Sequence, residues 1–220
     1  MKNKLCSILF SVAVFFFIIA FSIGLPIYFR PFYYAHIDAL DLVEKSGFTK
    51  AEIKEAYNEV IGYLTISGKE FGTGVMCHSE SGASHFADCK MLFDLNASVL
   101  VISAIIIIAL LVLYKQGKIE RPRIGKFSSE FYSAVAAIVL PVVLGGLVSI
   151  DFNKAFWIFH KILFRGNDNW LFDPLTDQII EVLPQTFFMN CAILIACSVL
   201  VISLGIIVKE IVVLNKTRRG

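Results

Sequence analysis

Charged residues are missing from four long stretches of this chain of 220 residues. The uncharged stretches are residues 5–29, 95–114, 131–150 and 183–208. A helix needs about 20 apolar residues to cross the hydrocarbon core of a bilayer. Hydrophobic residues make up 57% of the chain, above the roughly 45–50% of a soluble domain. The sequence therefore predicts an all-α polytopic membrane protein with four transmembrane helices, at approximately 5–28, 95–114, 131–150 and 186–208.

A signal-peptide cleavage site is also missing, because no small-x-small pattern follows the first stretch. The apolar region of a signal peptide has about 7–15 residues, whereas this stretch has 25. We therefore predict that the first stretch is an uncleaved membrane anchor.

Basic residues gather in three of the segments that flank the stretches. Segment 115–130 holds five Lys and Arg residues, and the terminal segments 1–4 and 209–220 are also basic. Basic flanks stay on the cytoplasmic side, so both termini are predicted to be cytoplasmic. Segments 30–94 and 151–182 then face outward, and they carry nine Lys and Arg against fifteen Asp and Glu. We predict that these two outer segments form a small extracellular cap.

Patterns for binding nucleotides, nucleic acids and metals are absent as well. The chain has no glycine-rich phosphate loop and no HExxH motif, and its outer Cys and His residues match no standard zinc spacing. The net charge of +2 is the small sum of the basic segments predicted on one face and the acidic segments predicted on the other. We therefore predict a single integral membrane domain over residues 1–220, with no metal, no cofactor and no nucleic-acid partner.

The first outer segment contains a helix with a clear start. Thr49-Lys50-Ala51-Glu52 is a capping box, in which the Thr and Glu side chains each accept a hydrogen bond from a free backbone N–H. Apolar residues then recur with helical spacing at Ile53, Ala56, Tyr57, Val60, Ile61 and Leu64. We predict that this face packs on the membrane or on the other outer segment. A shorter helix is predicted over 35–45.

All histidines of the chain lie in the outer segments, at positions 36, 78, 85 and 160. His85 and His160 each lie near a predicted membrane boundary, and Asp88 and Asp168 follow them. A carboxylate partner fixes the tautomer of an imidazole and stabilises its charged form. His160 also lies in an aromatic stretch typical of a helix at headgroup depth. These features predict an outward-facing polar patch at the membrane interface.

A serine nucleophile motif is missing, because the chain has no GxSxG. Cys77 and Cys89 both lie outside, where oxidation is favoured, so a disulfide that encloses His85 is predicted rather than a reactive thiol. From the residues alone, the substrate of the histidine patch is expected to be lipid-like or a lipid-anchored group.

Two blocks of sequence carry a resemblance to a known family. One is His85-Phe-Ala-Asp88-Cys-Lys90-Met-Leu-Phe93, just before the second predicted span. The other starts at Phe156 and reads FWIFHKILFRGNDNWLFDPLTDQIIEVLP, just before the last span. With these blocks and its four-span layout, the chain resembles the lipoprotein intramolecular transacylase (Lit) family of Gram-positive bacteria. It departs from the expected pattern at Cys89, where an aliphatic residue is expected.

The resemblance implies an activity and a set of site residues. Family members move the sn-2 acyl chain of a diacylglyceryl group to the α-amine of a lipoprotein's N-terminal cysteine, which gives the lyso-form. The substrate would be a diacylated lipoprotein N-terminus, held among membrane lipids of the cell membrane. The essential histidines would correspond to His85 and His160. The supporting residues would be Asp88, Lys90, Arg165, Asn167, Asp168 and Trp170.

The implied chemistry suits histidine. An imidazole has a pKa near 6.5 and an α-amine one of about 7.7–8.0, so an imidazole is able to take the amine's proton and return it to the leaving alkoxide. Two alternatives stay open. One is a membrane lipid hydrolase, including a zinc enzyme, which bound zinc would favour. The other is a non-enzymatic membrane sensor or accessory protein, whose function would survive alanine at both His85 and His160.

Overall fold

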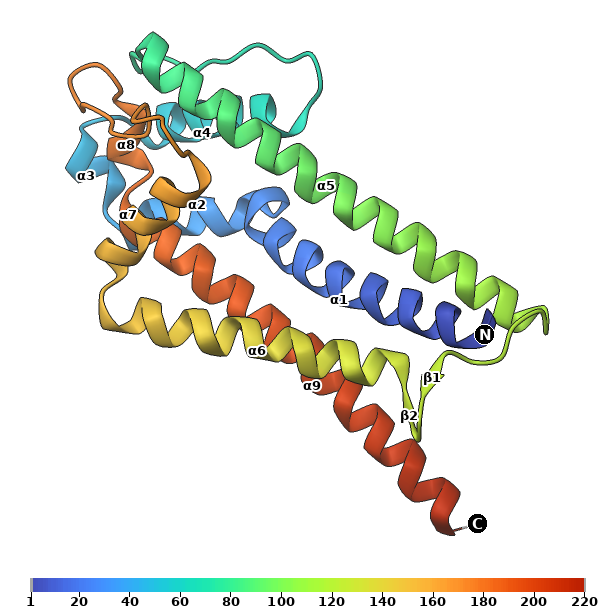
Figure 1. The fold of residues 1–220 in the computed structure, drawn as a ribbon. Coiled ribbons are helices and arrows are strands. Elements are labelled where there is room, and N and C mark those ends of the chain that lie inside the picture. The colour runs from blue at the N-terminus through green and yellow to red at the C-terminus, as the bar shows by residue number, and fades with distance from the viewer. Residues whose placement is uncertain (1, 220) are drawn as a thin grey trace. The chain divides into compact units, whose positions relative to one another are not determined.

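The computed structural model describes the backbone of residues 2–219, and their side chains except at 2, 140, 144, 146–150 and 217–219 (Figure 1). Its elements are α1 (Lys2–Tyr28), α2 (Arg30–Ala39), α3 (Leu42–Ser46), α4 (Lys50–Thr65), α5 (Glu80–Lys115), β1 (Arg123–Ile124), β2 (Phe127–Ser128), α6 (Ser129–Ile150), α7 (Phe152–Leu163), α8 (Ile179–Val182) and α9 (Gln185–Arg219). The chain divides into two compact units. The first unit is Met1–Gly24, Asn96–Leu147 and Leu194–Gly220, and the second is Leu25–Leu95 and Val148–Ile193.

Three helices of the described chain are long and apolar enough to cross a membrane. They are α1 from Asn3 to Tyr28, α5, and α9 from Gln185 to Lys216. The prediction of a helical, multi-pass membrane protein is therefore confirmed. Helix α6 has 22 residues and contains Pro141, and several of its side chains lie outside the described residues. The fourth predicted span stays a prediction, and positions 1 and 220 of the predicted cytoplasmic ends also lie outside the described residues.

The first unit contains a short hairpin that the sequence did not predict. Strands β1 and β2 pair antiparallel, with Ile124 opposite Phe127. The turn between them includes Gly125 with a φ of +61°, a conformation that favours glycine. The buried carboxylate of Glu210 on α9 accepts a hydrogen bond of 2.8 Å from the Ser128 N–H. These contacts give residues 123–128 a defined structure.

Helix α5 begins well before the predicted second span and continues through it without a break. It has 36 residues, and only its last part, 95–114, is free of charged residues. Its first part carries Glu80, Asp88, Lys90 and Asp94 and extends outside that uncharged part. His85 therefore stands on a continuous helical extension of a membrane-spanning segment.

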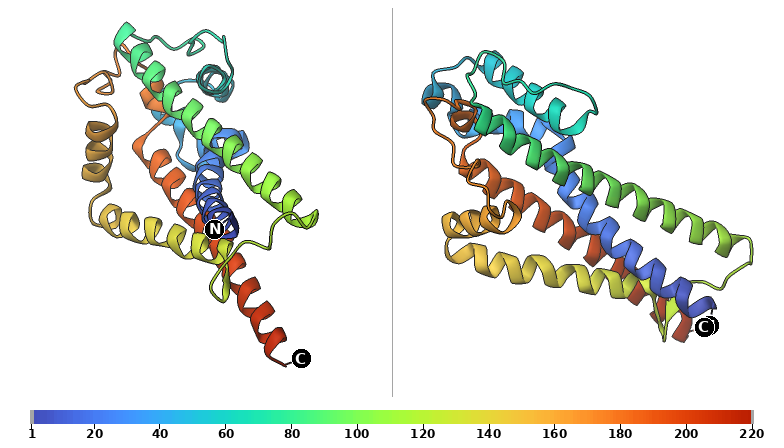
Figure 2. Two further views of the ribbon diagram at one scale, coloured as in Figure 1. Left: turned by 45° about the vertical axis from the view of Figure 1, so that its right-hand side comes forward. Right: turned by 45° about the horizontal axis from the view of Figure 1, so that its top comes forward.

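The second unit is built around α4. The predicted capping box is confirmed, because Thr49 accepts from the Glu52 N–H while Glu52 accepts from the Thr49 N–H. The predicted apolar face of α4 is buried, and the views in Figure 2 show α4 next to the first turns of α5. Tyr57 of α4 stacks on Tyr33 of α2 with ring centroids 3.7 Å apart. The Tyr33 hydroxyl donates to the Val182 carbonyl at 2.7 Å, which ties α2 to α8.

The predicted helix over 35–45 is wrong in its bounds. Two helices occupy this region, α2 and α3, and Asp41 separates them with a φ of +53°. A left-handed residue interrupts the hydrogen-bond ladder of a right-handed helix, so the chain turns at Asp41. The spacing of apolar residues gave no sign of this turn.

The start of α5 is fastened to the segment that precedes α8. The Asp177 carboxylate accepts hydrogen bonds from the backbone N–H and the hydroxyl of Ser79, at 2.8 and 2.9 Å. These bonds lower the pKa of Asp177, against the opposing effect of its burial. The Ser79 hydroxyl oxygen accepts in turn from the Gly82 N–H at 2.9 Å. The two outer segments thus fix the position of the helix end that carries His85.

Alanine at Gly82 is expected to disrupt this attachment. A Cβ at this position would overlap Oδ1 of Asp177 and approach the Phe172 ring. The carboxylate would have to leave Ser79, and losing charged hydrogen bonds costs about 1.5–3 kcal/mol. We expect a lower unfolding temperature for Gly82→Ala, measured by tryptophan fluorescence in lipid nanodiscs. Ser81→Ala changes an exposed neighbour and is expected to unfold like the wild type.

Candidate active site

His85 and His160 come together in the second unit. His85 lies in the second turn of α5 and His160 near the end of α7, 75 residues later. Their ring centroids are 5.9 Å apart and the ring planes differ by 33°. Both residues are buried, with 6% and 8% of their surface exposed. The two candidate histidines are therefore neighbours in one site.

Aromatic rings enclose the two imidazoles. Phe164 and Phe172 meet the His85 ring edge to face, at centroid distances of 4.7 and 5.5 Å. Phe156 and Trp170 lie 4.2 and 4.9 Å from the His160 ring. Four of the surrounding rings thus come from α7 or from the segment that follows it. They bury both imidazoles and give them an apolar environment.

The hydrogen bond of His160 fixes its tautomer. Its Nδ1 lies 2.8 Å from the backbone carbonyl oxygen of Phe156. A carbonyl oxygen only accepts, so Nδ1 carries the proton and Nε2 carries the lone pair. Burial lowers the pKa of His160, while the bond to Phe156 opposes this shift. At neutral pH His160 is therefore an uncharged imidazole whose Nε2 is a proton acceptor.

His85 has a similar environment but an incomplete set of hydrogen bonds. Burial lowers the pKa of His85 to about 4, and the nearby His160 adds to the shift, while Asp88 and Asn169 oppose it. Its Nε2 lies 3.4 Å from the Cys89 thiol sulfur. Its Nδ1 is buried and has no hydrogen-bond partner within the described part of the chain. His85 is thus also neutral at physiological pH.

Asp88 lies on the same helix as His85 but is hydrogen-bonded to the loop after α7. One of its oxygens accepts from the side-chain amides of Asn167 and Asn169, at 3.1 and 2.9 Å. Asn169 is buried, with 8% of its surface exposed. Asp88 therefore connects the two outer segments through amides rather than through a hydrogen bond to an imidazole.

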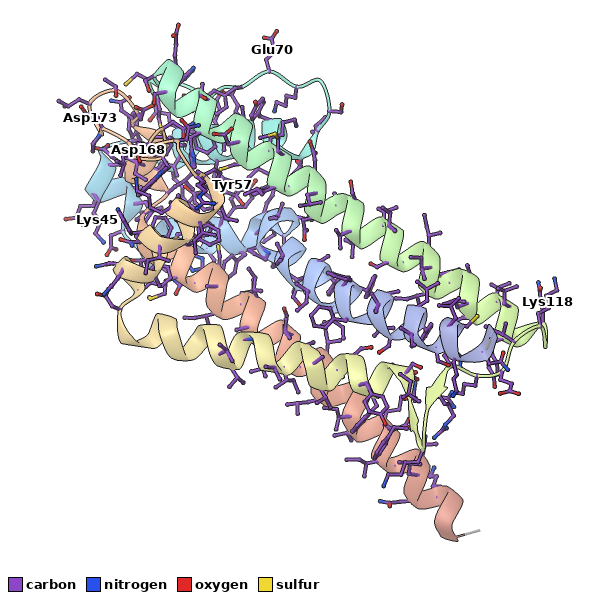
Figure 3. All side chains as sticks on the ribbon, viewed as in Figure 1. Lys45, Tyr57, Glu70, Lys118, Asp168 and Asp173 are labelled. Atoms are coloured by element: carbon purple, nitrogen blue, oxygen red, sulfur yellow. The ribbon has the colours of Figure 1, made fainter. Side chains whose placement is uncertain are left out.

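Most of the other predicted supporting residues lie at the edge of the site. Asp168 forms an ion pair of 2.5 Å with Lys161, and Figure 3 shows Asp168 and Asp173 in the loop that follows α7. The Lys90 ammonium donates to the backbone carbonyl of Tyr63 at the end of α4. Arg165 is exposed. In this arrangement Lys90 and Asp168 hold neighbouring elements in place, and neither is hydrogen-bonded to a histidine.

Trp170 links the loop to the histidines. Its indole N–H donates to the Asn167 carbonyl at 3.1 Å, and its ring stacks at a tilt of 30° against His160. The Lys161 ammonium lies over the rings of Trp157 and Trp170, 5.5 and 5.7 Å from their centroids. The loop is therefore held against α7 by both polar and aromatic contacts.

Comparison with known proteins assigns the chain to a family. The model of the lipoprotein intramolecular transacylase Lit matches residues 8–188. The chain belongs to this family. The resemblance found in the two sequence blocks is thus confirmed, and so is the prediction of an acyltransferase of the membrane.

Solved structures of a Lit protein resemble this chain along its whole length. The in meso structure of the membrane integral lipoprotein intramolecular transacylase Lit from Bacillus cereus is 28% identical, covers 100% of this chain and 99% of its own, and has a TM-score of 0.87. Two structures of variants of that protein, with a histidine replaced by alanine or by arginine, have TM-scores of 0.80 and 0.79. No match was found among the curated proteins.

The predicted disulfide between Cys77 and Cys89 is not formed in this Lit family member. Both cysteines are free thiols. Cys77 precedes α5 and its thiol donates to the Leu175 carbonyl at 3.6 Å, whereas Cys89 lies on the third turn of the helix. The Cys89 sulfur instead lies 3.4 Å from Nε2 of His85, so the two thiols have different neighbours. Burial raises the pKa of Cys89 to about 12, so its thiol stays protonated.

One polar residue of the site, Asn169, was absent from the predicted set, as were the enclosing phenylalanines. Asn169 is more deeply placed than Asn167, and it contacts Asp88 and the Ser84 hydroxyl, the latter at 3.4 Å. The sequence carried one signal, because Asn169 lies between Asp168 and Trp170 within the second block of the resemblance.

The described residues contain no group of three or more His, Cys, Asp or Glu side chains arranged to hold a metal ion.

Proposed function

We propose that the chain transfers the sn-2 acyl group of a lipoprotein's diacylglyceryl moiety to the α-amine of the same N-terminal cysteine. The observation that carries this proposal is the pair of buried, uncharged histidines 5.9 Å apart in an aromatic enclosure. The product is a lyso-form lipoprotein with an N-acyl group. Membership of the Lit family supports the proposal.

The reaction balances with two proton acceptors and no cofactor. At neutral pH the amine begins as an ammonium ion, because its pKa is about 7.7–8.0. The new N–C bond forms, the ester C–O bond breaks, and the nitrogen loses two protons. One of these protons is returned to the glycerol oxygen, and the other leaves to solvent. Positioning supplies much of the rate increase, because ester and amine belong to one molecule.

We assign the two proton transfers to the two imidazoles. His160, with a lone pair on Nε2, takes a proton from the ammonium ion and returns it to the leaving alkoxide. His85 takes the second proton from the attacking nitrogen as the tetrahedral intermediate forms. Both roles need an imidazole that is neutral before reaction, and the lowered pKa values of both residues provide this. General acid–base catalysis of this kind contributes about 10²–10⁴-fold to a rate.

The proposed location of the site is the outer face of the membrane. Helix α6 would be the fourth span, which puts both termini in the cytoplasm and makes the second unit an extracellular cap. Helix α7 supports this arrangement, because it exposes an apolar face that includes Trp157 and Ile162, at 51% and 68%. An amphipathic helix with aromatic residues suits the headgroup region. The lipid part of a lipoprotein lies at that depth.

Mass spectrometry of lipoprotein N-terminal peptides tests the proposed function. Cells that make only diacylated lipoproteins with a free α-amine would express this chain. We expect a product of unchanged mass, in which one acyl chain has moved from glycerol to nitrogen. Mixing two purified lipoproteins, one with deuterated acyl chains, is expected to give no exchange between them. Loss of an acyl chain without N-acylation would instead indicate a hydrolase, and an unchanged peptide from well-expressed protein would contradict transacylation.

A further inference from the structure

Two polar side chains near His85, those of Asn169 and Asp88, contact each other. Asp88 accepts a hydrogen bond of 2.9 Å from Nδ2 of Asn169. Oδ1 of Asn169 and Nδ1 of His85 are both buried, and neither has a hydrogen-bond partner in the part of the chain that the structure describes. The interaction between the Asn169 and His85 side chains favours the charged imidazole. Because Nδ2 of Asn169 is directed at Asp88 and at the Ser84 hydroxyl, Oδ1 is the end of the amide that is left to accept from the ring.

We propose that Asn169 is a positioning residue that holds His85 as the Nδ1–H tautomer, and that Asp88 sets the direction of the Asn169 amide. A carboxylate oxygen only accepts hydrogen bonds, so Asp88 keeps Nδ2 of Asn169 on its own side. Oδ1 must then point away from Asp88, and it accepts only from a protonated Nδ1. His85 consequently keeps its lone pair on Nε2, where the substrate amine is to be deprotonated.

The tautomers of His85 and His160 are fixed by different kinds of acceptor. The backbone carbonyl of Phe156 fixes the His160 tautomer directly, because a backbone oxygen cannot rotate away. His85 lies on a helix with no such carbonyl assigned to its Nδ1, so a side-chain oxygen has to serve. An amide by itself offers either end to the ring, and the carboxylate of Asp88 removes that ambiguity. Both imidazoles then present Nε2 as the proton acceptor.

Asn167 provides a matched control within the same loop. It also donates to Asp88, at 3.1 Å, but it is exposed and has no interaction with His85 that contributes to the histidine's protonation. Replacing Asn167 by leucine removes an amide–carboxylate bond of the same kind. It leaves Asn169 between Asp88 and His85, and it therefore separates loss of loop attachment from loss of tautomer control.

Nitrogen NMR of the full-length protein in lipid nanodiscs tests the inference directly. The protein would carry ¹⁵N-labelled histidine, and a His85→Gln variant would identify the His85 signals. At a pH above the range in which histidine titrates, the wild type and Asn167→Leu are expected to carry the proton on Nδ1 of His85. Asn169→Leu is expected to shift it wholly or partly to Nε2. His85 with its proton on Nε2 in the wild type would overturn the inference, as would an Asn169→Leu spectrum that matches the wild type.

A reciprocal exchange keeps the test independent of folding. In the Asp88→Asn, Asn169→Asp double variant, an amide at 88 donates to a carboxylate at 169, whose other oxygen again accepts from Nδ1. We expect this variant to recover the Nδ1–H form. Asp88→Asn alone lets the Asn169 amide turn and is expected to give a mixture of tautomers. A double variant no closer to the wild type than the single one would contradict the role of Asp88.

The inference rests on the proposed transacylase function only in its kinetic consequence. Asn169→Leu is expected to lower kcat by about 10–1000-fold with little change in KM, since holding a catalytic histidine in the wrong tautomer costs up to about 10⁴-fold. A controlled tautomer in a protein without transacylase activity would reject the function and keep the inference. Full activity in Asn169→Leu with an altered tautomer would reject its catalytic importance.

Discussion

Glutamine at His160 is expected to lower the rate of acyl transfer by about 10²–10⁴-fold, which is the usual contribution of a positioned general acid–base group. Glutamine fills part of the space of the imidazole and stays polar, but it cannot take up a proton near neutral pH. The same loss is expected for His85→Gln, because the ammonium must lose two protons. The rate of N-acyl product formation, followed by mass spectrometry at saturating substrate, measures the effect.

The two substitutions are not expected to add. Residues that act on one reaction path give non-additive losses, so the double variant should be close to the slower single variant. His78→Gln is the matched control, since His78 lies in the same outer segment, bonds to Thr73 at 2.9 Å and has no place in the histidine pair. A wild-type rate for either catalytic variant, with His78→Gln equally active, would refute acid–base catalysis by the pair.

The parts of this protein that the sequence predicts well are those with local causes. Long uncharged stretches indicate spans whatever their neighbours are, and three helices in the structure agree. The capping box at Thr49 and the buried face of α4 each depend on residues that are only a few positions apart in the chain. His85 and His160 were singled out because each lies near a predicted membrane boundary and within a block that resembles the family, and the structure brings their ring centroids to 5.9 Å.

The failures concern contacts between distant segments and local backbone conformation. The role of Asn169 depends on Asp88, 81 residues earlier, and no periodicity connects the two. The predicted disulfide is not formed because the Cys77 thiol contacts the Leu175 carbonyl and the Cys89 thiol contacts His85. Asp41 breaks a predicted helix through a positive φ, which is uncommon for a residue other than glycine. Each of these features is decided by packing that the sequence pattern does not show.

Acidification is expected to destabilise the folded protein through the same histidines. Burial lowers the pKa of His85 to about 4 and also lowers that of His160, whereas an unfolded chain has histidine pKa values near 6.5. Between these values the unfolded chain binds protons that the folded chain does not. The stabilisation is therefore complete above about pH 6.5 and is lost as the pH falls through the folded-state pKa. For His85 the difference corresponds to about 3 kcal/mol.

The unfolding temperature as a function of pH, followed by the fluorescence of Trp157 and Trp170 in nanodiscs, measures this loss. The wild type should lose more stability than His85→Gln between about pH 6.5 and 4, because glutamine does not titrate. The curve of the His78→Gln control should follow the wild type. Equal slopes for the wild type and His85→Gln would mean that His85 is not held neutral. A steeper slope in the wild type would show that the folded protein holds His85 uncharged. The proposed transfer requires this uncharged state.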